Sequence, residues 1–222
     1  MPKTLSKRDV DILEEKGLWE AHSYLHRIVK RLSRKSLPVE IRYIREAHKR
    51  TFMVARQPEI AGRYRRDNSQ ELRRIDGSFL RVTDWKNIPN ELAELDYELR
   101  DETKNLKPPI TEEEYRRIIC VAAKLSHRFA CIHPFINGNG RASRLLIDAI
   151  LIRAGLPSVA VKKIKPQYLR AMRQADDGDL SRLENIIIDS LEENKTKTYK
   201  IVLRKKAEYR ESQHRRNGLR RK

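Results

Sequence analysis

Residues 133–144 read His-Pro-Phe-Ile-Asn-Gly-Asn-Gly-Arg-Ala-Ser-Arg and connect two segments whose apolar residues repeat with helical spacing. Within this stretch, Gly138 and Gly140 flank Asn139, and glycine allows a backbone to approach a ligand closely. A helix that begins at Arg141 would present unpaired N–H groups and the positive end of its dipole to the loop. The stretch therefore predicts a binding site for an anion such as a phosphate group.

The side chains of this stretch add groups that suit phosphate chemistry. Arg141 and Arg144 are three residues apart, so both can project to one side of a helix and bind phosphate oxygens in bidentate fashion. His133 can accept a proton near neutral pH. Taken singly, a loop histidine is usually structural, Phe135 is an ordinary core anchor, and an arginine pair is a solvated helix face. Their occurrence together at these offsets favours a functional site.

Helical patterns dominate the rest of the chain. Apolar residues recur at spacings of three and four, Thr111 and Glu114 form a capping-box pattern, and prolines and glycines mark the breaks. The predicted helices cover residues 5–37, a second segment that ends near 54, and then 88–107, 111–131, 141–154, 166–175 and 180–193. We expect an all-α fold in which residues 141–154, apolar on nearly all sides, form the central core helix.

One segment departs from the helical pattern. Residues 57–84 contain Pro58, Gly62 and Gly77, and they end in a short run at 78–83 with a strand-like composition. This composition predicts a small β-hairpin or flap. A surface loop without a special role fits the same residues nearly as well.

The composition limits the class of protein. Charged residues make up 36% and hydrophobic residues 39% of the 222 positions, which excludes collagen-like and Gly/Pro-rich disordered chains and suits one domain, placed at residues 1–200. The longest apolar stretch, Leu145–Ile152, is too short to cross a bilayer. Cys120 and Cys131 cannot build a disulfide framework, and the N-terminus lacks a signal-peptide pattern. We expect a cytoplasmic chain without a membrane span.

Positive charge is concentrated near the C-terminus. The chain has 49 Lys and Arg residues against 31 Asp and Glu residues, a net charge of +18 that attracts phosphate-bearing partners. Residues 201–222 are assigned as a separate basic tail, because 204–222 hold nine basic and two acidic residues. Such a tail can bind nucleic acid, an acidic partner or a membrane surface. The simpler interpretation, which the composition favours, is a solvated, disordered chain end.

The stretch at 133–144 resembles the motif of the Fic family, H-x-F-x-[D/E]-G-N-G-R-x-x-R, at every specified position except one. The predicted flap and the helix that starts at Pro89 also resemble the layout of that family. The resemblance implies an all-α, Fic-type helical bundle with a small β-hairpin flap that holds a target chain in extended form. It further implies a nucleotidyltransferase that moves AMP from ATP to a Tyr, Ser or Thr hydroxyl of a target protein and releases pyrophosphate.

The resemblance also implies roles for individual residues. His133 would be the general base that takes the proton of the target hydroxyl as its oxygen attacks the α-phosphate. Arg144, together with Arg141, would neutralise charge on the phosphates and the leaving group, and Mg²⁺ would bridge the phosphates. Phe135 would pin the loop to the core. The implied nucleotide-binding residues are Phe135, Asn137, Gly138, Asn139, Gly140, Arg141 and Arg144.

The departure from the motif is Asn137, where the family usually has an Asp or Glu that ligates the magnesium ion. An amide oxygen can coordinate a hard cation, but it brings no charge and binds the ion more weakly. Two alternatives to an adenylyltransferase therefore stay open, a Fic-fold pseudoenzyme and a transferase that uses another phosphate-containing donor. The net charge of +18 supports a third alternative, a basic protein that associates with nucleic acid.

Restraint of the activity is a further expectation from the resemblance. Many Fic proteins carry a helix with the pattern [S/T]-x-x-x-E-[G/N], whose glutamate pairs with the second arginine of the motif. Residues 189–194, Asp-Ser-Leu-Glu-Glu-Asn, come nearest to this pattern and would make Glu193 the restraining residue, although they depart from it at the first position. The alternatives are an unrestrained protein and restraint by a separate antitoxin chain.

Overall fold

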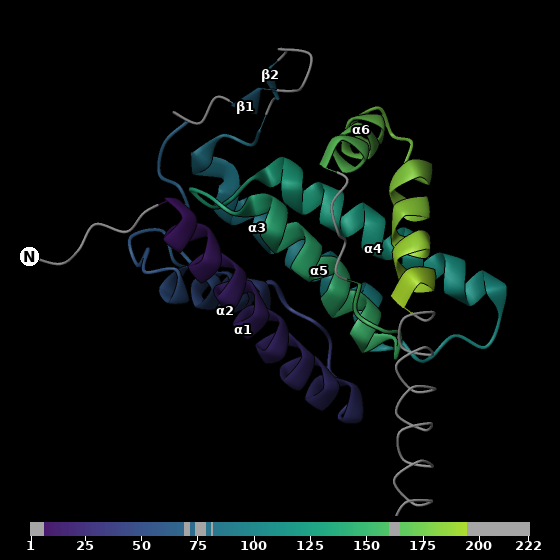
Figure 1. The fold of residues 1–222 in the computed structure, drawn as a ribbon. Coiled ribbons are helices and arrows are strands. Elements are labelled where there is room, and N and C mark those ends of the chain that lie inside the picture. The colour runs from purple at the N-terminus through teal and green to yellow at the C-terminus, as the bar shows by residue number, and fades with distance from the viewer. Residues whose placement is uncertain (1–6, 69–71, 74–78, 81, 160–164, 195–222) are drawn as a thin grey trace, which may run out of the picture.

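The structure is a computed structural model that describes residues 7–68, 72–73, 79–80, 82–159 and 165–194. The predicted basic tail, residues 201–222, lies outside these ranges. The described residues confirm the all-α prediction (Figure 1). The helices are α1 (Lys7–Arg34), α2 (Ile41–Val54), the short 3-10 helix η1 (Trp85–Asn87), α3 (Ile88–Lys104), α4 (Glu112–Ile132), α5 (Asn139–Arg153), α6 (Lys165–Asp176) and a further helix over residues 181–194.

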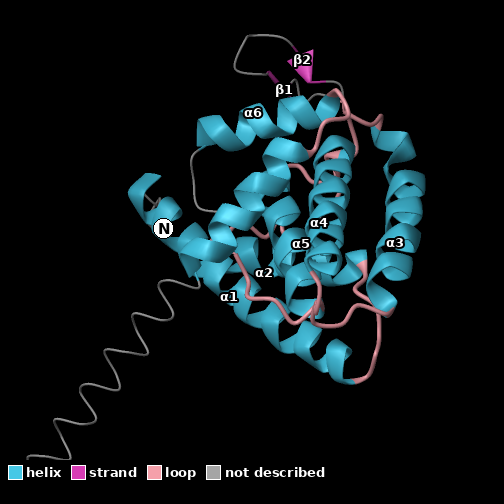
Figure 2. Cartoon of the chain, turned by 90° about the vertical axis from the view of Figure 1, so that its right-hand side faces the viewer, coloured by secondary structure: helices cyan, strands magenta, loops and turns pink. Residues whose placement is uncertain are grey.

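Helix α5 is the centre of the fold, as its apolar composition predicts. All of its side chains from Leu145 to Arg153 are buried. Helices α1, α2 and α4 contact it, and α3 packs on the outer side of α4, as Figure 2 shows. Because α5 begins directly after the loop at 133–138, the core holds one end of that loop rigidly.

The helix boundaries follow the local signals in the sequence. The Thr111 hydroxyl accepts the backbone N–H of Glu114 at 3.1 Å, and the Glu114 carboxylate accepts the N–H of Thr111 at 3.1 Å, which completes the predicted capping box of α4. Helix α5 begins at Asn139, slightly earlier than predicted. The reason is Gly138, which takes the N-cap position with a φ of 79° that glycine adopts readily.

The predicted hairpin is present as a minimal antiparallel pair. Strand β1 (Leu72–Arg73) pairs with β2 (Phe79–Leu80) in the register Leu72 to Leu80 and Arg73 to Phe79. Figure 1 shows the pair above the end of the bundle at which α3 begins. The hairpin is therefore a small addition to a helical fold.

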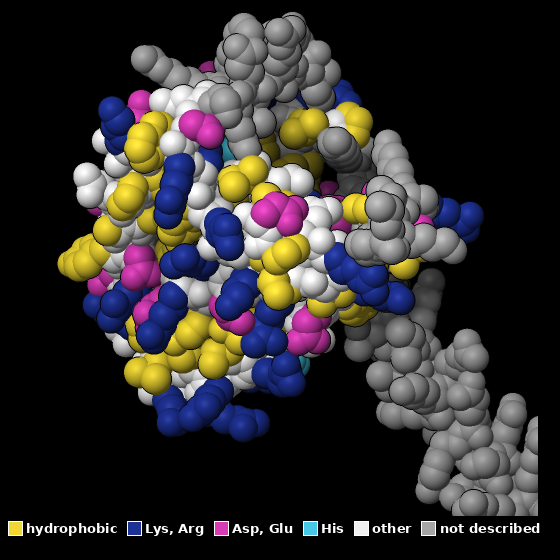
Figure 3. Space-filling model, turned by 90° about the vertical axis from the view of Figure 1, so that its left-hand side faces the viewer, with side chains coloured by type: hydrophobic (Ala, Val, Ile, Leu, Met, Phe, Trp, Pro, Cys, Tyr) yellow, Lys and Arg dark blue, Asp and Glu magenta, His cyan; other side chains and the backbone are white. Residues whose placement is uncertain are grey.

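The surface charge and the helix composition concern two expectations, a nucleic-acid partner and a chain without a membrane span. On the face drawn in Figure 3, Lys and Arg side chains are interspersed with acidic and hydrophobic ones. Among the helices that the structure describes, none combines the length and the apolar character needed to cross a bilayer.

Candidate active site

The loop between α4 and α5 begins at His133, which ends α4 in a left-handed conformation with a φ of 50°. This turn is uncommon for a residue with a side chain, so neighbouring contacts must hold it. The imidazole hydrogen-bonds the backbone carbonyl of Ala130. Burial, reinforced by the charge of Arg65, lowers the pKa of His133 to about 4. The ring is therefore uncharged at neutral pH and keeps one nitrogen that can accept a proton.

Arg65 is the residue that holds the end of α4 in this shape. Its side chain is buried, with 3% exposure, and its Nε donates to the His133 carbonyl at 2.8 Å. Its Nη2 donates to the Ile132 carbonyl at 3.4 Å, and its backbone N–H donates to the Pro134 carbonyl at 2.9 Å. These contacts satisfy carbonyl groups that the end of a helix leaves unpaired.

The same guanidinium joins the loop to the base of the hairpin. Arg65 Nη1 donates to the Asp67 carbonyl and to Asn68 Oδ1, each at 3.0 Å, and Nη2 donates to the Thr83 carbonyl. Asn68 in turn donates from Nδ2 to Asp84 at 2.8 Å. Sequence reasoning missed this residue, because Arg65 lies in a run of polar residues that gives no sign of burial.

Phe135 and Asn139 close the loop onto itself. Phe135 is 1% exposed, and its ring stacks on His48 of α2 with a centroid distance of 3.7 Å. Asn139 Oδ1 accepts the Phe135 N–H and Asn139 Nδ2 donates to the Phe135 carbonyl, both at 2.8 Å. The resemblance implied that Asn139 binds a ligand. Both polar atoms of its side chain contact its own loop here, so its backbone N–H is the group left for an anion.

His48 of α2 supports the loop, and sequence reasoning did not identify this residue. His48 Nδ1 accepts the Gly62 N–H at 3.0 Å, so the ring proton must be on Nε2, which donates to the Asn137 carbonyl at 2.8 Å. Burial is the main cause that lowers the pKa of His48 to about 4, and the charge of Arg141 acts in the same direction. A second ring proton would meet the Gly62 N–H, so only the neutral ring fits.

Gly138 and Asn137 form the turn that leads into α5. A Cβ atom at Gly138 would lie 2.6 Å from Phe52 Cε2, so a larger residue cannot take this position without displacing the phenyl ring. Asn137 is exposed, and its Oδ1 accepts the Gly138 N–H at 2.7 Å. An amide oxygen accepts two hydrogen bonds, so Asn137 retains capacity to coordinate a cation.

The first turn of α5 has N–H groups without helical partners. The first intrahelical bond runs from the Ala142 N–H to the Gly138 carbonyl at 2.9 Å. By helix geometry, the N–H groups of Asn139, Gly140 and Arg141 then point out of the helix end without helical partners. Together with the helix dipole, they make this turn suitable for binding phosphate.

The two arginines of the motif have different partners. Arg141 Nη1 pairs with Glu14 of α1 at 2.7 Å, and its guanidinium lies 4.6 Å from the centroid of the Phe52 ring. Arg144 lies over the Tyr168 ring of α6 at 5.6 Å. In this structure Glu14 holds Arg141, and the expectation that both arginines bind one phosphate group stays a prediction.

Glu14 was also missed by sequence reasoning, which named only Glu193 as the residue nearest to a restraining pattern. The structure places Glu193 with an exposed side chain near the end of the helix at 181–194. One feature of the sequence could have drawn attention to this region. Gly17 follows Glu14 by about one helical turn, and a glycine inside a helical pattern usually has a packing or functional reason. A Cβ at Gly17 would collide with the backbone oxygen of Thr51, so this glycine allows α1 to lie close against α2.

A model of the Fic/DOC family matches residues 38–151 of the chain. The protein adenylyltransferase Fic of Drosophila grimshawi is 42% identical over 72 residues, which are 32% of this chain and 15% of that protein. Its counterpart from Drosophila mojavensis is 40% identical over 72 residues, which are 32% and 14% of the two chains. The match therefore spans about 15% of the length of these curated relatives.

Solved structures share the fold over most of the chain. A fragment of Fic-1 from C. elegans aligns with a TM-score of 0.68 and 23% identity, over 91% of this chain and 54% of that one. A Fic-domain signaling protein from Bacteroides thetaiotaomicron gives 0.58 and 22%, over 87% and 76%. BepC from Bartonella tribocorum, solved with bound AMPPNP, gives 0.52 and 19%, over 79% and 86%. At these identities the likeness concerns the fold alone.

The neutral state of His48 predicts a pH-dependent stability. The folded-state pKa of about 4 lies below the ordinary value of 6.5, so the stabilisation is present above pH 6.5 and is lost as the pH falls toward 4. We expect His48→Gln to destabilise the protein at pH 7, and the gap to the wild type to shrink by about 3 kcal/mol between pH 7 and pH 4. Urea unfolding in buffers without divalent cations measures both.

The matched control is His26→Gln, which changes an exposed histidine of α1. Its free energy of unfolding should run parallel to that of the wild type across the same pH range. A constant gap between His48→Gln and the wild type would show that His48 is not held neutral by the fold.

Proposed function

The chain belongs to the Fic/DOC family, and from this premise we propose that it is a protein adenylyltransferase. It transfers AMP from ATP to a side-chain hydroxyl of a target protein. The hydroxyl oxygen forms a bond to the α-phosphorus, the bond from that phosphorus to the bridging oxygen breaks, and pyrophosphate leaves. The observation that carries the proposal is the loop that starts at His133, where Arg65 binds the backbone carbonyl at 2.8 Å, and that leads into the first turn of α5, whose N–H groups lack helical partners.

His133 is the proposed general base. Its ring is neutral at neutral pH, because burial lowers its pKa to about 4, so one ring nitrogen carries no proton. That nitrogen takes the proton of the target hydroxyl as the new bond to phosphorus forms. Arg65 acts as a positioning residue, because it binds the backbone of His133 and not the reacting atoms.

The phosphates of ATP are proposed to bind at the first turn of α5. The backbone N–H groups of Asn139, Gly140 and Arg141 would donate to phosphate oxygens, and the helix dipole favours the negative charge there. Arg144, and Arg141 once it leaves Glu14, would neutralise charge that develops on the leaving group. The AMPPNP bound to the related BepC supports ATP as the donor.

A magnesium ion would be held mainly by the phosphates of the nucleotide. The loop at 133–144 contains no carboxylate, and the exposed Asn137 offers a neutral amide oxygen with remaining capacity. When bound, the ion supplies positive charge that neutralises the phosphates. The neutral amide of Asn137, where the family motif has a carboxylate, is the observation that favours the second candidate function, a Fic fold that binds a nucleotide without transferring AMP.

The target is proposed to be a protein segment that lies extended beside the hairpin of β1 and β2. Short strands with an open edge can pair with an added strand through backbone hydrogen bonds. The curated relatives named protein adenylyltransferases support a protein as the substrate class. A separate antitoxin chain, and nucleic acid or an acidic partner at residues 201–222, remain further proposals for partners.

Transfer of AMP can be tested by the intact mass of the chain and by pyrophosphate release after incubation with ATP and Mg²⁺. We expect the wild type to gain the mass of AMP and to release pyrophosphate, and His133→Ala to lose both by a factor of about 100 or more, because it lacks the base. Asn137→Asp should lower the Mg²⁺ concentration required, because a carboxylate adds charge.

The control for this assay is His26→Ala, which removes an exposed histidine and should behave as the wild type. Equal transfer by His133→Ala would refute the assigned base. Nucleotide binding by the wild type without added mass or pyrophosphate, with transfer restored in Asn137→Asp, would favour the binding-only Fic fold.

The Glu14–Arg141 pair predicts that Glu14 competes with ATP. Both side chains are partly buried, at 25% and 20% exposure, so the phosphates must displace a carboxylate to reach Arg141. We expect Glu14→Gln to tighten ATP binding by about 5-fold, the range of one partly exposed ion pair. Isothermal titration calorimetry measures the change. Glu15→Gln, which alters the exposed neighbour, is the matched control.

The competition also predicts a dependence on Arg141. In an Arg141→Ala background, Glu14→Gln should have no effect on ATP affinity, because the contact is already lost. An equal gain in both backgrounds would mean that Glu14 acts only through the general charge of the site.

A further inference from the structure

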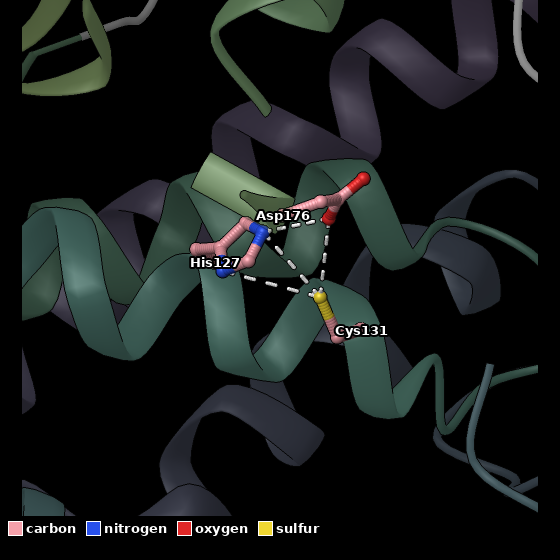
Figure 4. A group of neighbouring side chains, drawn as sticks. All are labelled: His127, Cys131 and Asp176. Atoms are coloured by element: carbon pink, nitrogen blue, oxygen red, sulfur yellow. Dashed lines mark hydrogen bonds and ion pairs between the residues drawn. The ribbon is translucent and has the colours of Figure 1, made fainter. Parts of the chain in front are cut away.

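A cluster of three potential metal ligands lies outside the nucleotide loop. His127 and Cys131 occupy successive turns of α4, and Asp176 is the last residue of α6. Figure 4 shows the three side chains converging between the two helices. His127 and Cys131 are partly buried, and Asp176 is an exposed residue whose side chain is 19% exposed. The cluster is therefore shielded by both helices but open to an ion from solvent.

The separations of the ligand atoms suit one small ion. His127 Nε2 lies 2.9 Å from Asp176 Oδ1 and 3.5 Å from Cys131 Sγ, and Cys131 Sγ lies 3.8 Å from Asp176 Oδ1. Ligand atoms around a tetrahedral zinc ion, at bond lengths of about 2.0–2.3 Å, lie about 3.3–3.6 Å apart. The observed distances bracket this range, so small side-chain rotations would place all three atoms on one ion.

The chemistry of the ligands selects the class of metal. A thiolate, an imidazole and a carboxylate together suit Zn²⁺ and similar borderline ions, whereas Mg²⁺ and Ca²⁺ prefer oxygen ligands. A deprotonated Cys131 and the Asp176 carboxylate would balance the two charges of the ion. Three protein ligands also leave the fourth tetrahedral position for water or for another group.

We propose that His127, Cys131 and Asp176 form a zinc-class metal site that ties α6 to the last turn of α4. Cys131 lies two residues before His133, so an ion at this site stabilises the end of the helix that carries the proposed base. The site needs no nucleotide, and its existence does not depend on the proposed transfer reaction. Its test therefore fails or succeeds separately from that of the proposed function.

The experiment uses the full chain, freed of metal with a chelator and titrated with Co²⁺ and then with Zn²⁺. Co²⁺ is a spectroscopic probe for zinc sites, since tetrahedral coordination gives strong visible bands and a thiolate ligand adds a near-ultraviolet charge-transfer band. We expect one ion per chain, with both features present. Zn²⁺ should displace Co²⁺ and raise the melting temperature of the wild type.

Single variants assign the ligands. Cys131→Ser should abolish the charge-transfer band, and Cys131→Ser, His127→Gln and Asp176→Asn should each weaken Zn²⁺ binding by about 100-fold or more. None of them should show the rise in melting temperature with Zn²⁺. Circular dichroism without metal checks that each variant is folded.

Two controls separate this site from other ligands on the chain. Cys120→Ser removes the exposed cysteine of the same helix, and His133→Ala removes the histidine of the nucleotide loop. Both should keep the Co²⁺ spectrum and the Zn²⁺ affinity of the wild type. The proposal is overturned if the wild type shows no thiolate band, if the band survives Cys131→Ser, or if Cys120→Ser abolishes it.

Discussion

The burial of α5 on nearly every side is the constraint on which the rest of the structure depends. A helix with apolar residues all around it must be enclosed, and α1, α2 and α4 supply that enclosure. The loop that precedes α5 then has one fixed end. Its other end is fixed where α4 stops, so the residues between Ile132 and Asn139 are held at both sides by packed helices.

Two buried side chains, those of His48 and Arg65, fix the conformation of the loop between these helices. His48 supports the loop through the Asn137 carbonyl and the Phe135 ring, and Arg65 holds the carbonyl groups at the end of α4. Within the loop, both act on backbone groups or on a buried ring, not on exposed side chains. The exposed parts of the loop therefore stay available for a ligand, while the geometry is set from within the core.

Patterns along the chain were sufficient to predict the helices, the capping box at Thr111 and the motif at 133–144, because each depends on residues close together in sequence. Contacts between distant elements could not be predicted. Arg65 meets His133 across 68 residues, Glu14 meets Arg141 across 127, and His127 meets Asp176 across 49. Nothing in the periodicity of either partner marks such a pair, since the packing of whole helices decides it.

The contacts of Arg65 have a consequence for how this site can evolve. In the hairpin base and at the end of α4 it binds chiefly the carbonyl oxygens of Asp67, Thr83, Ile132 and His133. Every amino acid provides a carbonyl oxygen, so mutations at those positions need not disturb the anchor. The hairpin segment, which would select a target protein, can therefore change in sequence while the Arg65 contacts that hold the end of α4 stay the same.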